Sequence, residues 1–138
     1  MPARKLNGER TMRNFVALVF LGGGAGAVLR EILMLVIPRL ADNFPLDILV
    51  ANLVASFVLG LVTVLSRRHV VSDGINLLVG TGIAGGLSTF SSFAYGTVVL
   101  MSGSAASLVV ASAYVLISLF LGFIAVVCGQ QMAKRFFP

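Results

Sequence analysis

The chain has 138 residues, of which 58% are hydrophobic and 11% charged, and its mean hydropathy is +1.03. Soluble domains are roughly a quarter charged, so a soluble fold of this length could not bury so much apolar surface, and an integral membrane protein is predicted. The net charge of +5 does not indicate nucleic-acid binding, because the basic residues lie at predicted helix ends and short loops. A single cysteine, Cys128, excludes an internal disulfide and a cysteine-based metal site. One histidine and five acids argue against an enzyme.

Four segments are long enough to cross a bilayer core of about 30 Å, which takes about 20 helical residues. We expect them at residues 15–37, 46–65, 75–101 and 105–128, after an N-terminal extension at 1–13. The short connections force neighbouring helices to run antiparallel, and the alternation typical of barrel strands is absent. A cleaved signal peptide is the alternative for the first segment, but three further spans follow it. The predicted fold is an all-α membrane protein, with one domain of four transmembrane helices over residues 1–138.

Basic residues are divided unequally between the two ends of the predicted helices. With the N-terminus inside, one side holds eight of them and the other side holds only Arg39. The eight are Arg4, Lys5, Arg10, Arg13, Arg67, Arg68, Lys134 and Arg135. Taken alone, the positive-inside rule therefore predicts a single orientation for every copy of the chain.

The centre of the third segment, residues 80–93, is rich in glycine and in hydroxyl side chains. This composition weakens a helix, and backbone groups freed at that depth must be buried in protein or bind something. Broken membrane helices commonly place such groups at an ion site. We therefore expect the third helix to be broken at its centre. The alternative is a continuous helix whose small residues form a packing face.

Polar and aromatic side chains near the middle of two segments are candidates for contact with an anion. Asn52 offers two N–H donors near the middle of the second segment, and Ser56 follows one turn later on the same face. Phe90 and Phe93, with Ser91 between them, are neighbours on one face of a helix, and the rim of a phenyl ring carries partial positive charge. The alternatives are an interhelical hydrogen bond for the asparagine and lipid-facing or core-filling positions for the rings.

Three further features lie in the first and fourth segments. Tyr114 and Ser118 are one turn apart on a single stripe, which is either a packing face or a hydrogen-bonding track along a pore. Arg30 lies two-thirds of the way along the first segment, where the alternative is an anchor that snorkels to the headgroups. Gly22 and Gly26 have the small-xxx-small spacing that lets two helix backbones approach closely, so we expect them at a helix–helix contact.

Three motifs, one in each of the first three segments, resemble the Fluc/CrcB family of fluoride channels. The family patterns are Gly-Gly-x-x-Gly-Ala-x-x-Arg, Asn-x-x-x-Ser-Phe-x-x-Gly and Gly-Gly-x-Thr-Thr-Phe-Ser-Thr-Phe. They are met by Gly22, Gly23, Gly26, Ala27 and Arg30, by Asn52, Ser56, Phe57 and Gly60, and by Gly85, Gly86, Thr89, Phe90, Ser91 and Phe93. The departures are serines for threonines at Ser88 and Ser92, Glu31 for an aromatic residue, and Asp47-Ile48 for Gly-Thr. Length and number of spans agree, so the resemblance covers nearly the whole chain.

The resemblance implies a fluoride-selective ion channel of the cell inner membrane, which exports fluoride passively from the cytoplasm as an antiparallel, dual-topology homodimer. The residues that would form the fluoride pathway are Asn52, Ser56, Phe90, Ser91, Phe93, Tyr114 and Ser118. Backbone carbonyls of Gly85 and Ser88 from both subunits would hold a buried structural sodium ion (Na+), and Arg30 would lie near the vestibule or brace the fold. The third and fourth segments contain no acid, which fits a route for an anion.

Two alternative functions stay open at this point. A small multidrug-resistance-type cation/proton antiporter also has four spans and depends on a membrane-embedded glutamate. Glu31 is the only candidate, and Arg30 beside it would oppose cation binding. A non-transporting assembly subunit would explain the glycines but not the donors beside Phe90 and Phe93. The antiparallel arrangement conflicts with the unequal division of basic residues, and we give the third motif more weight.

Overall fold

The computed structural model describes residues 2–37, 44–102 and 105–137, with side chains from residue 12 onward except those of residues 105 and 106. The elements in chain order are α1 (Pro2–Val36), α2 (Leu46–Arg67), α3 (Asp73–Asn76), the π-helix η2 (Leu77–Ala84), α4 (Gly85–Leu87), α5 (Phe90–Met101) and α6 (Ala105–Phe136). Four stretches among the described residues are long and apolar enough to cross a membrane: Met12–Val36, Leu46–Arg67, Asp73–Met101 and Ser107–Phe136. The prediction of an all-α protein with four membrane-spanning helices is confirmed.

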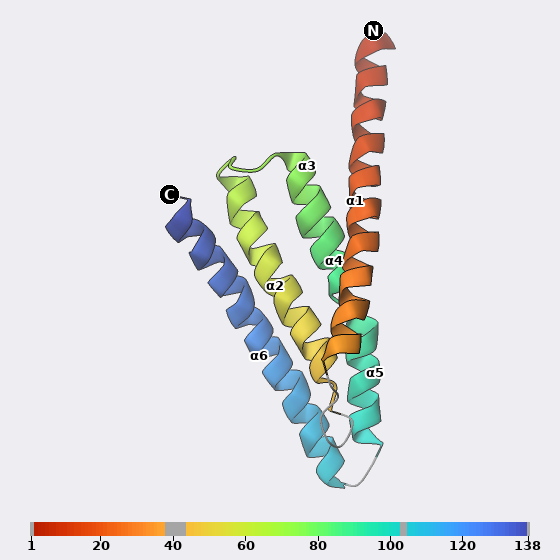
Figure 1. The fold of residues 1–138 in the computed structure, drawn as a ribbon, viewed down its shortest axis with the longest axis vertical. Coiled ribbons are helices and arrows are strands. Elements are labelled where there is room, and N and C mark those ends of the chain that lie inside the picture. The colour runs from red at the N-terminus through yellow and green to blue at the C-terminus, as the bar shows by residue number, and fades with distance from the viewer. Residues whose placement is uncertain (1, 38–43, 103–104, 138) are drawn as a thin grey trace.

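The four spans form a bundle in which α6 lies along α2, and α1 lies along η2 and α4 (Figure 1). The first and last described residues lie toward the same end of the bundle, as an even number of spans requires (Figure 1). Short connections put consecutive spans side by side and antiparallel. Arg39, together with part of the connections before α2 and α6, lies outside the described residues.

Glycines set the distance between α1 and the third span. A Cβ atom added at Gly22 would collide with the Leu78 carbonyl oxygen, and one at Gly26 with the Ile83 carbonyl oxygen. A Cβ atom at Gly86 would collide in turn with the Gly23 carbonyl oxygen. The helix–helix contact predicted for Gly22 and Gly26 is therefore confirmed, and it is a contact of backbone on backbone.

Helices α2 and α6 are held together in the same way along their length. A Cβ atom at Gly60 would meet the Val126 carbonyl oxygen, and one at Gly129 would meet the Phe57 carbonyl oxygen. Nearer their C-terminal ends, Ala133 is fully buried in a cluster with Val64 and Leu65. These two helices therefore form one rigid pair, against which the third span packs.

The third span is interrupted at its centre, as the sequence predicts. Helix α4 ends at Leu87, Ser88 is extended with a ψ angle of 149°, and Thr89 is extended with φ of −145° and ψ of 113°. Helix α5 then begins at Phe90. The π-helix before the break was not predicted, because its wider hydrogen-bond spacing leaves no periodic signature in so short a segment.

The outer helices are longer than the segments expected at 15–37 and 105–128. Helix α1 already begins at Pro2, and α6 continues to Phe136. Hydropathy marks only the part of a helix that lies in hydrocarbon. Residues such as lysine, arginine and glutamine continue a helix readily in water, so the helical conformation extends past the apolar part at both places.

Candidate functional site

The break in the third span is closed by a side chain from α2. Asn52 Oδ1 accepts a hydrogen bond from the backbone N–H of Thr89 at 2.8 Å, and Asn52 Nδ2 donates to the carbonyl oxygen of the same residue at 3.4 Å. The Asn52 amide therefore replaces the helical acceptor that the Thr89 N–H loses at the break and adds a second contact to the carbonyl of the same residue. Because an amide nitrogen carries two hydrogens, one N–H of Asn52 is left for another acceptor.

Thr89 is also the cap of the helix that follows. Its Oγ1 accepts the backbone N–H of Ser92 at 3.1 Å and donates to Ser92 Oγ at 3.0 Å. Ser91 Oγ lies 3.3 Å from the same hydroxyl. The Thr89 side chain satisfies one of the free N–H groups at the start of α5, and it is itself buried, with 7% of its surface exposed. The start of α5, and with it the direction of Phe90 and Phe93, is therefore fixed by this residue.

The hydrogen bonds that the backbone N–H groups of Thr89 and Ser92 donate to side chains leave two backbone carbonyls before the break without their helical donors. In a continuous helix, the N–H of Thr89 would bond to the carbonyl of Gly85, and the N–H of Ser92 to that of Ser88. Here both N–H groups donate to side-chain oxygens instead. The Gly85 carbonyl keeps a long contact of 3.4 Å from Ser88 Oγ. The two carbonyls named by the family resemblance, those of Gly85 and Ser88, are thus among the carbonyls whose helical donors are diverted.

Arg30 is positioned by the close approach of α1 to the third span. Its Nη1 donates to the carbonyl oxygen of Gly86 at 3.1 Å. The guanidinium therefore bonds to the carbonyl that follows that of Gly85 in α4. This contact satisfies a carbonyl whose helical donor would be the N–H of Phe90, the first residue of α5. Glu31, the next residue, is exposed.

An open groove of about 420 Å³ runs beside the break, between α2, the start of α5 and α6. Its described lining contains amide, hydroxyl and aromatic side chains and no acidic residue. The lining residues are Asn52, Leu53, Ser56, Ser88, Thr89, Phe90, Phe93, Ser118, Leu119, Gly122, Phe123 and Val126. Five of the seven residues predicted to form a pathway are therefore brought together from three helices that are distant in sequence.

The remaining two predicted residues, Ser91 and Tyr114, lie outside the described lining of this groove. Ser91 is exposed. Tyr114 is 1% exposed, and its ring centroid lies 5.4 Å from that of Phe93. The hydroxyl groups of Tyr114 and Ser118 are both buried, and neither reaches hydrogen-bond geometry with a partner in the described part of the chain. Tyr114 thus backs the groove through Phe93.

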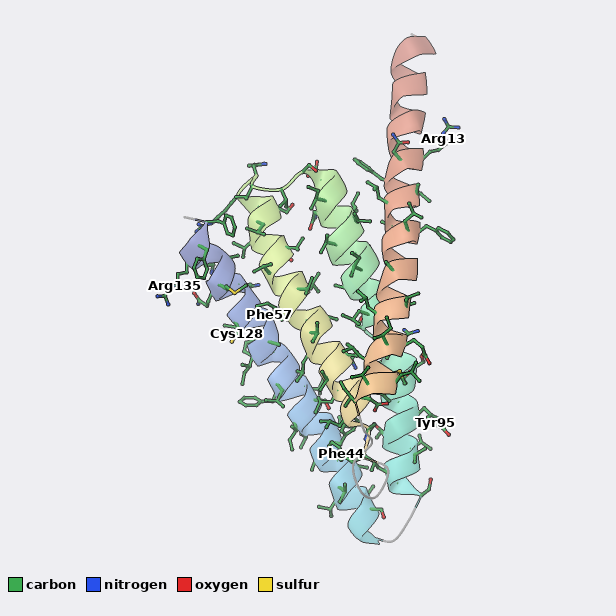
Figure 2. All side chains as sticks on the ribbon, in the orientation of Figure 1. Arg13, Phe44, Phe57, Tyr95, Cys128 and Arg135 are labelled. Atoms are coloured by element: carbon green, nitrogen blue, oxygen red, sulfur yellow. The ribbon has the colours of Figure 1, made fainter. Side chains whose placement is uncertain are left out.

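Four rings stand in series, of which two line the groove and two lie behind it. Phe44, just before α2, meets Tyr114 edge to face, with ring centroids 5.4 Å apart and an interplanar angle of 86°. Tyr114 lies against Phe93 at an angle of 32°, and Phe93 lies 6.3 Å from Phe90. Figure 2 shows Phe44 at the end of the bundle where α2 begins. Such pairs favour fixed ring orientations, so Phe44 and Tyr114 restrict how Phe93 can turn.

Sequence reasoning placed Thr89 in the third motif without a structural role, and it gave no role to Phe44. Thr89 carried a usable signal, since a threonine directly before an apolar helical run is a typical N-cap. Phe44 carried none, because its partner Tyr114 is 70 positions away in the chain and the contact depends on how α2 and α6 pack.

Comparison with known proteins identifies the family. The family model described as CrcB-like protein, Camphor Resistance (CrcB), matches residues 17–130. The chain belongs to the CrcB family. Among its curated relatives in that family is the Fluoride-specific ion channel FluC 3 of Yersinia pseudotuberculosis serotype I, which is 48% identical over 124 residues that cover 90% of this chain and 92% of the relative. FluC of Gloeothece citriformis is 34% identical over 121 residues, which cover 87% and 97% of the two chains.

Not all CrcB relatives have the same length. The Fluoride-specific ion channel FluC 2 of Brucella melitensis biotype 1 is 49% identical over 124 residues, which cover 90% of this chain but 46% of the relative. The chain therefore spans about half the length of that protein. The family resemblance stated from the motifs is confirmed, and the chain is a multi-pass membrane protein. The comparisons give no support to a multidrug antiporter.

Proposed function

We propose that the chain is a fluoride-selective channel of the inner membrane that lets fluoride leave the cytoplasm passively. The observation that carries this proposal is the groove at the break, where Asn52, two phenyl rings and several hydroxyls converge without an acidic residue in the described lining. The three CrcB relatives described above are each named a fluoride-specific ion channel, which supports it.

Fluoride is small and strongly hydrated, so a pathway has to replace its water shell with donors. The free N–H of Asn52, the hydroxyls of Ser56 and Ser118 and the positive rims of Phe90 and Phe93 are such donors. A carboxylate in the groove would repel the ion. Proton coupling needs a group that titrates at the centre of a span, and the described lining offers none. The ion therefore follows its own electrochemical gradient.

The proposal includes a second, antiparallel copy of the chain and a structural sodium ion between the two. Its support is the pair of carbonyls, at Gly85 and Ser88, whose helical donors are diverted to side chains. Carbonyl oxygens suit hard cations, and such ions take about six or more oxygen ligands. Two oxygens from one chain are too few, so a symmetric partner that supplies the same two makes a more complete site. When bound, the ion would neutralise the partial negative charge of these carbonyls.

The test of the channel is fluoride efflux from liposomes that contain the purified protein, followed with a fluoride-selective electrode. We expect efflux of fluoride and none of chloride. Phe90→Ile and Phe93→Ile should reduce the flux, because an aliphatic side chain offers no positive ring edge. Phe120→Ile is the matched control, since Phe120 is exposed on α6 and outside the described groove lining. Absence of efflux, or equal efflux of chloride, would end this proposal.

The antiparallel arrangement has its own test. Val70→Cys, in a background with Cys128→Ser, places a single thiol at the exposed turn after α2. In intact cells, a membrane-impermeant maleimide should label about half of the molecules if the two orientations are equally populated. Labelling of none would instead support the single orientation that the basic residues predict, with this turn inside, and labelling of all would support the opposite single orientation. Sodium is tested separately, by the loss of thermal stability when it is exchanged for a large organic cation.

A further inference from the structure

The C-terminal ends of α2 and α6 meet at one end of the bundle (Figure 1). They are held there by the packing of Ala133, which is fully buried, against Val64 and Leu65. A second contact crosses between them, because Arg68 Nη1 donates to the backbone carbonyl of Phe137. The two ends therefore form one fixed surface and not two independent tails.

Four cations and two phenyl rings gather on this surface, which we call the basic end. Arg67 and Arg68 follow one another where α2 ends, and Lys134 and Arg135 lie in the last turn of α6. All four are exposed. The rings are those of Phe136 and Phe137, with 68% and 43% of their surfaces exposed, and Figure 2 shows Arg135 at this end of α6.

The negative end of the helix dipole accounts for part of this pattern, because a cation in a last turn is stabilised there. It does not account for four cations on two adjacent helix ends, nor for exposed phenyl rings beside them. Two of the described acids, Glu31 and Asp47, lie toward the opposite end of their spans. Asp73 begins α3 at the same end of the bundle as the four cations and offsets one of them (Figure 1). The basic end therefore carries a concentrated positive charge at the depth where a span leaves the hydrocarbon.

We propose that the basic end is a binding site for an anionic phospholipid of the surrounding bilayer. Basic clusters directly beside a transmembrane helix attract anionic headgroups, and guanidinium groups match phosphate oxygens in a two-pronged geometry. Arg67 and Arg135 take the phosphate from two sides, and Phe136 contacts the upper part of an acyl chain. The apolar contact distinguishes a lipid from free phosphate. If the chain forms the antiparallel pair proposed above, each leaflet contains one such site.

The test titrates the purified full-length chain, in a neutral detergent, with phosphatidylglycerol or with phosphatidylcholine of the same acyl chains. Bound lipid is counted by native mass spectrometry. We expect tighter binding of phosphatidylglycerol. In the variant Arg67→Gln/Lys134→Gln/Arg135→Gln, that affinity should fall by about fivefold for each charge, or about a hundredfold in all. Arg68 is retained because its contact with Phe137 holds the two ends together.

Arg13→Gln is the matched control, because Arg13 is exposed on α1, away from α6 (Figure 2). It should change the affinity less than twofold. Equal losses in both variants, or equal binding of the two lipids by the native chain, would overturn the site in favour of general attraction to charge. Displacement of the lipid by millimolar inorganic phosphate would instead assign the site to free phosphate. Phe136→Ser should weaken the binding of phosphatidylglycerol, because it removes the apolar contact with the acyl chain, and inorganic phosphate should still not displace the lipid.

Two further arrangements keep the result interpretable. If the triple variant does not purify, Arg67→Lys/Arg135→Lys preserves the charge and should lower the affinity, because an ammonium group cannot form the two-pronged contact. Unchanged affinity in that variant would overturn the assigned geometry. The readout counts bound lipid and does not depend on ion flux, so a chain that binds phosphatidylglycerol but conducts no fluoride would refute the proposed function alone.

Discussion

Replacement of Asn52 by alanine tests the central feature of the site. The structure gives the Asn52 amide two hydrogen bonds to Thr89, of 2.8 Å and 3.4 Å. Thr89 is 7% exposed, so its N–H group would be left buried and unpaired. An unpaired buried polar group costs about 1–3 kcal/mol, whereas an average interhelical hydrogen bond in a membrane protein contributes about 0.6 kcal/mol. We expect Asn52→Ala to lower the free energy of unfolding by about 1–3 kcal/mol.

The same substitution should also lower fluoride flux. It removes the remaining N–H of Asn52 from the groove, and a hydrogen bond to a charged group contributes about 1.5–3 kcal/mol, which corresponds to about tenfold or more in rate. Asn52→Asp separates the two effects. Its carboxylate still accepts the N–H of Thr89, so the protein should be more stable than Asn52→Ala, yet the negative charge should stop fluoride.

Stability is measured by thermal unfolding in detergent with far-UV circular dichroism, and flux by electrode recording on liposomes. If Asn52→Ala unfolds as the native chain does, the amide does not hold the break. If it carries native flux as well, the role of Asn52 in both structure and conduction is refuted.

Three further changes test the packing around the break. Gly26→Ala should lower the melting temperature, because its Cβ atom would collide with the backbone at Ile83 and overpacking costs about 1–3 kcal/mol; Gly24→Ala, which has open space around the added atom, should melt at or above the native value. Thr89→Val should destabilise the protein by about 0.5–2 kcal/mol through loss of the cap, with Thr89→Ser restoring most of it in the same melting experiment. Phe44→Ala should reduce fluoride flux by freeing the Tyr114 ring that backs the groove, whereas Phe44→Tyr should conduct as the native chain does.

The number of spans and the place of the break could be predicted because both depend on local composition. Apolar runs of sufficient length mark a span whatever its neighbours are. The glycines and hydroxyl residues around Gly85 and Gly86 weaken a helix in any context. Likewise, the spacing of Gly22 and Gly26 predicts a close contact without naming the partner helix. The sequence does not indicate which backbone segment each glycine contacts, because that depends on the packing of α1 against η2.

The partners of polar groups could not be predicted, because they come from segments distant in the chain. Asn52 and Thr89 are 37 positions apart, and Arg30 and Gly86 are 56 apart. The motifs show that these residues are present, but not that Asn52 Oδ1 takes the place of the helical acceptor for the Thr89 N–H. For Asn52 the sequence left two roles open, a donor to an ion and an interhelical hydrogen bond, and the structure shows the second, with the backbone of Thr89 as its partner.

One chain satisfies some of the polar groups at the break and turns others outward. Three side chains hydrogen-bond to backbone groups within the bundle. Asn52 accepts the N–H of Thr89, Arg30 donates to the carbonyl of Gly86, and the Thr89 hydroxyl accepts the N–H of Ser92. Gly85 and Ser88 remain exposed, as does Phe90, which has 82% of its surface uncovered. A bilayer core does not tolerate bare backbone carbonyls against lipid. The exposed side of the break therefore supports the antiparallel pair proposed above, in which a second copy of this chain would cover the break with the same polar surface.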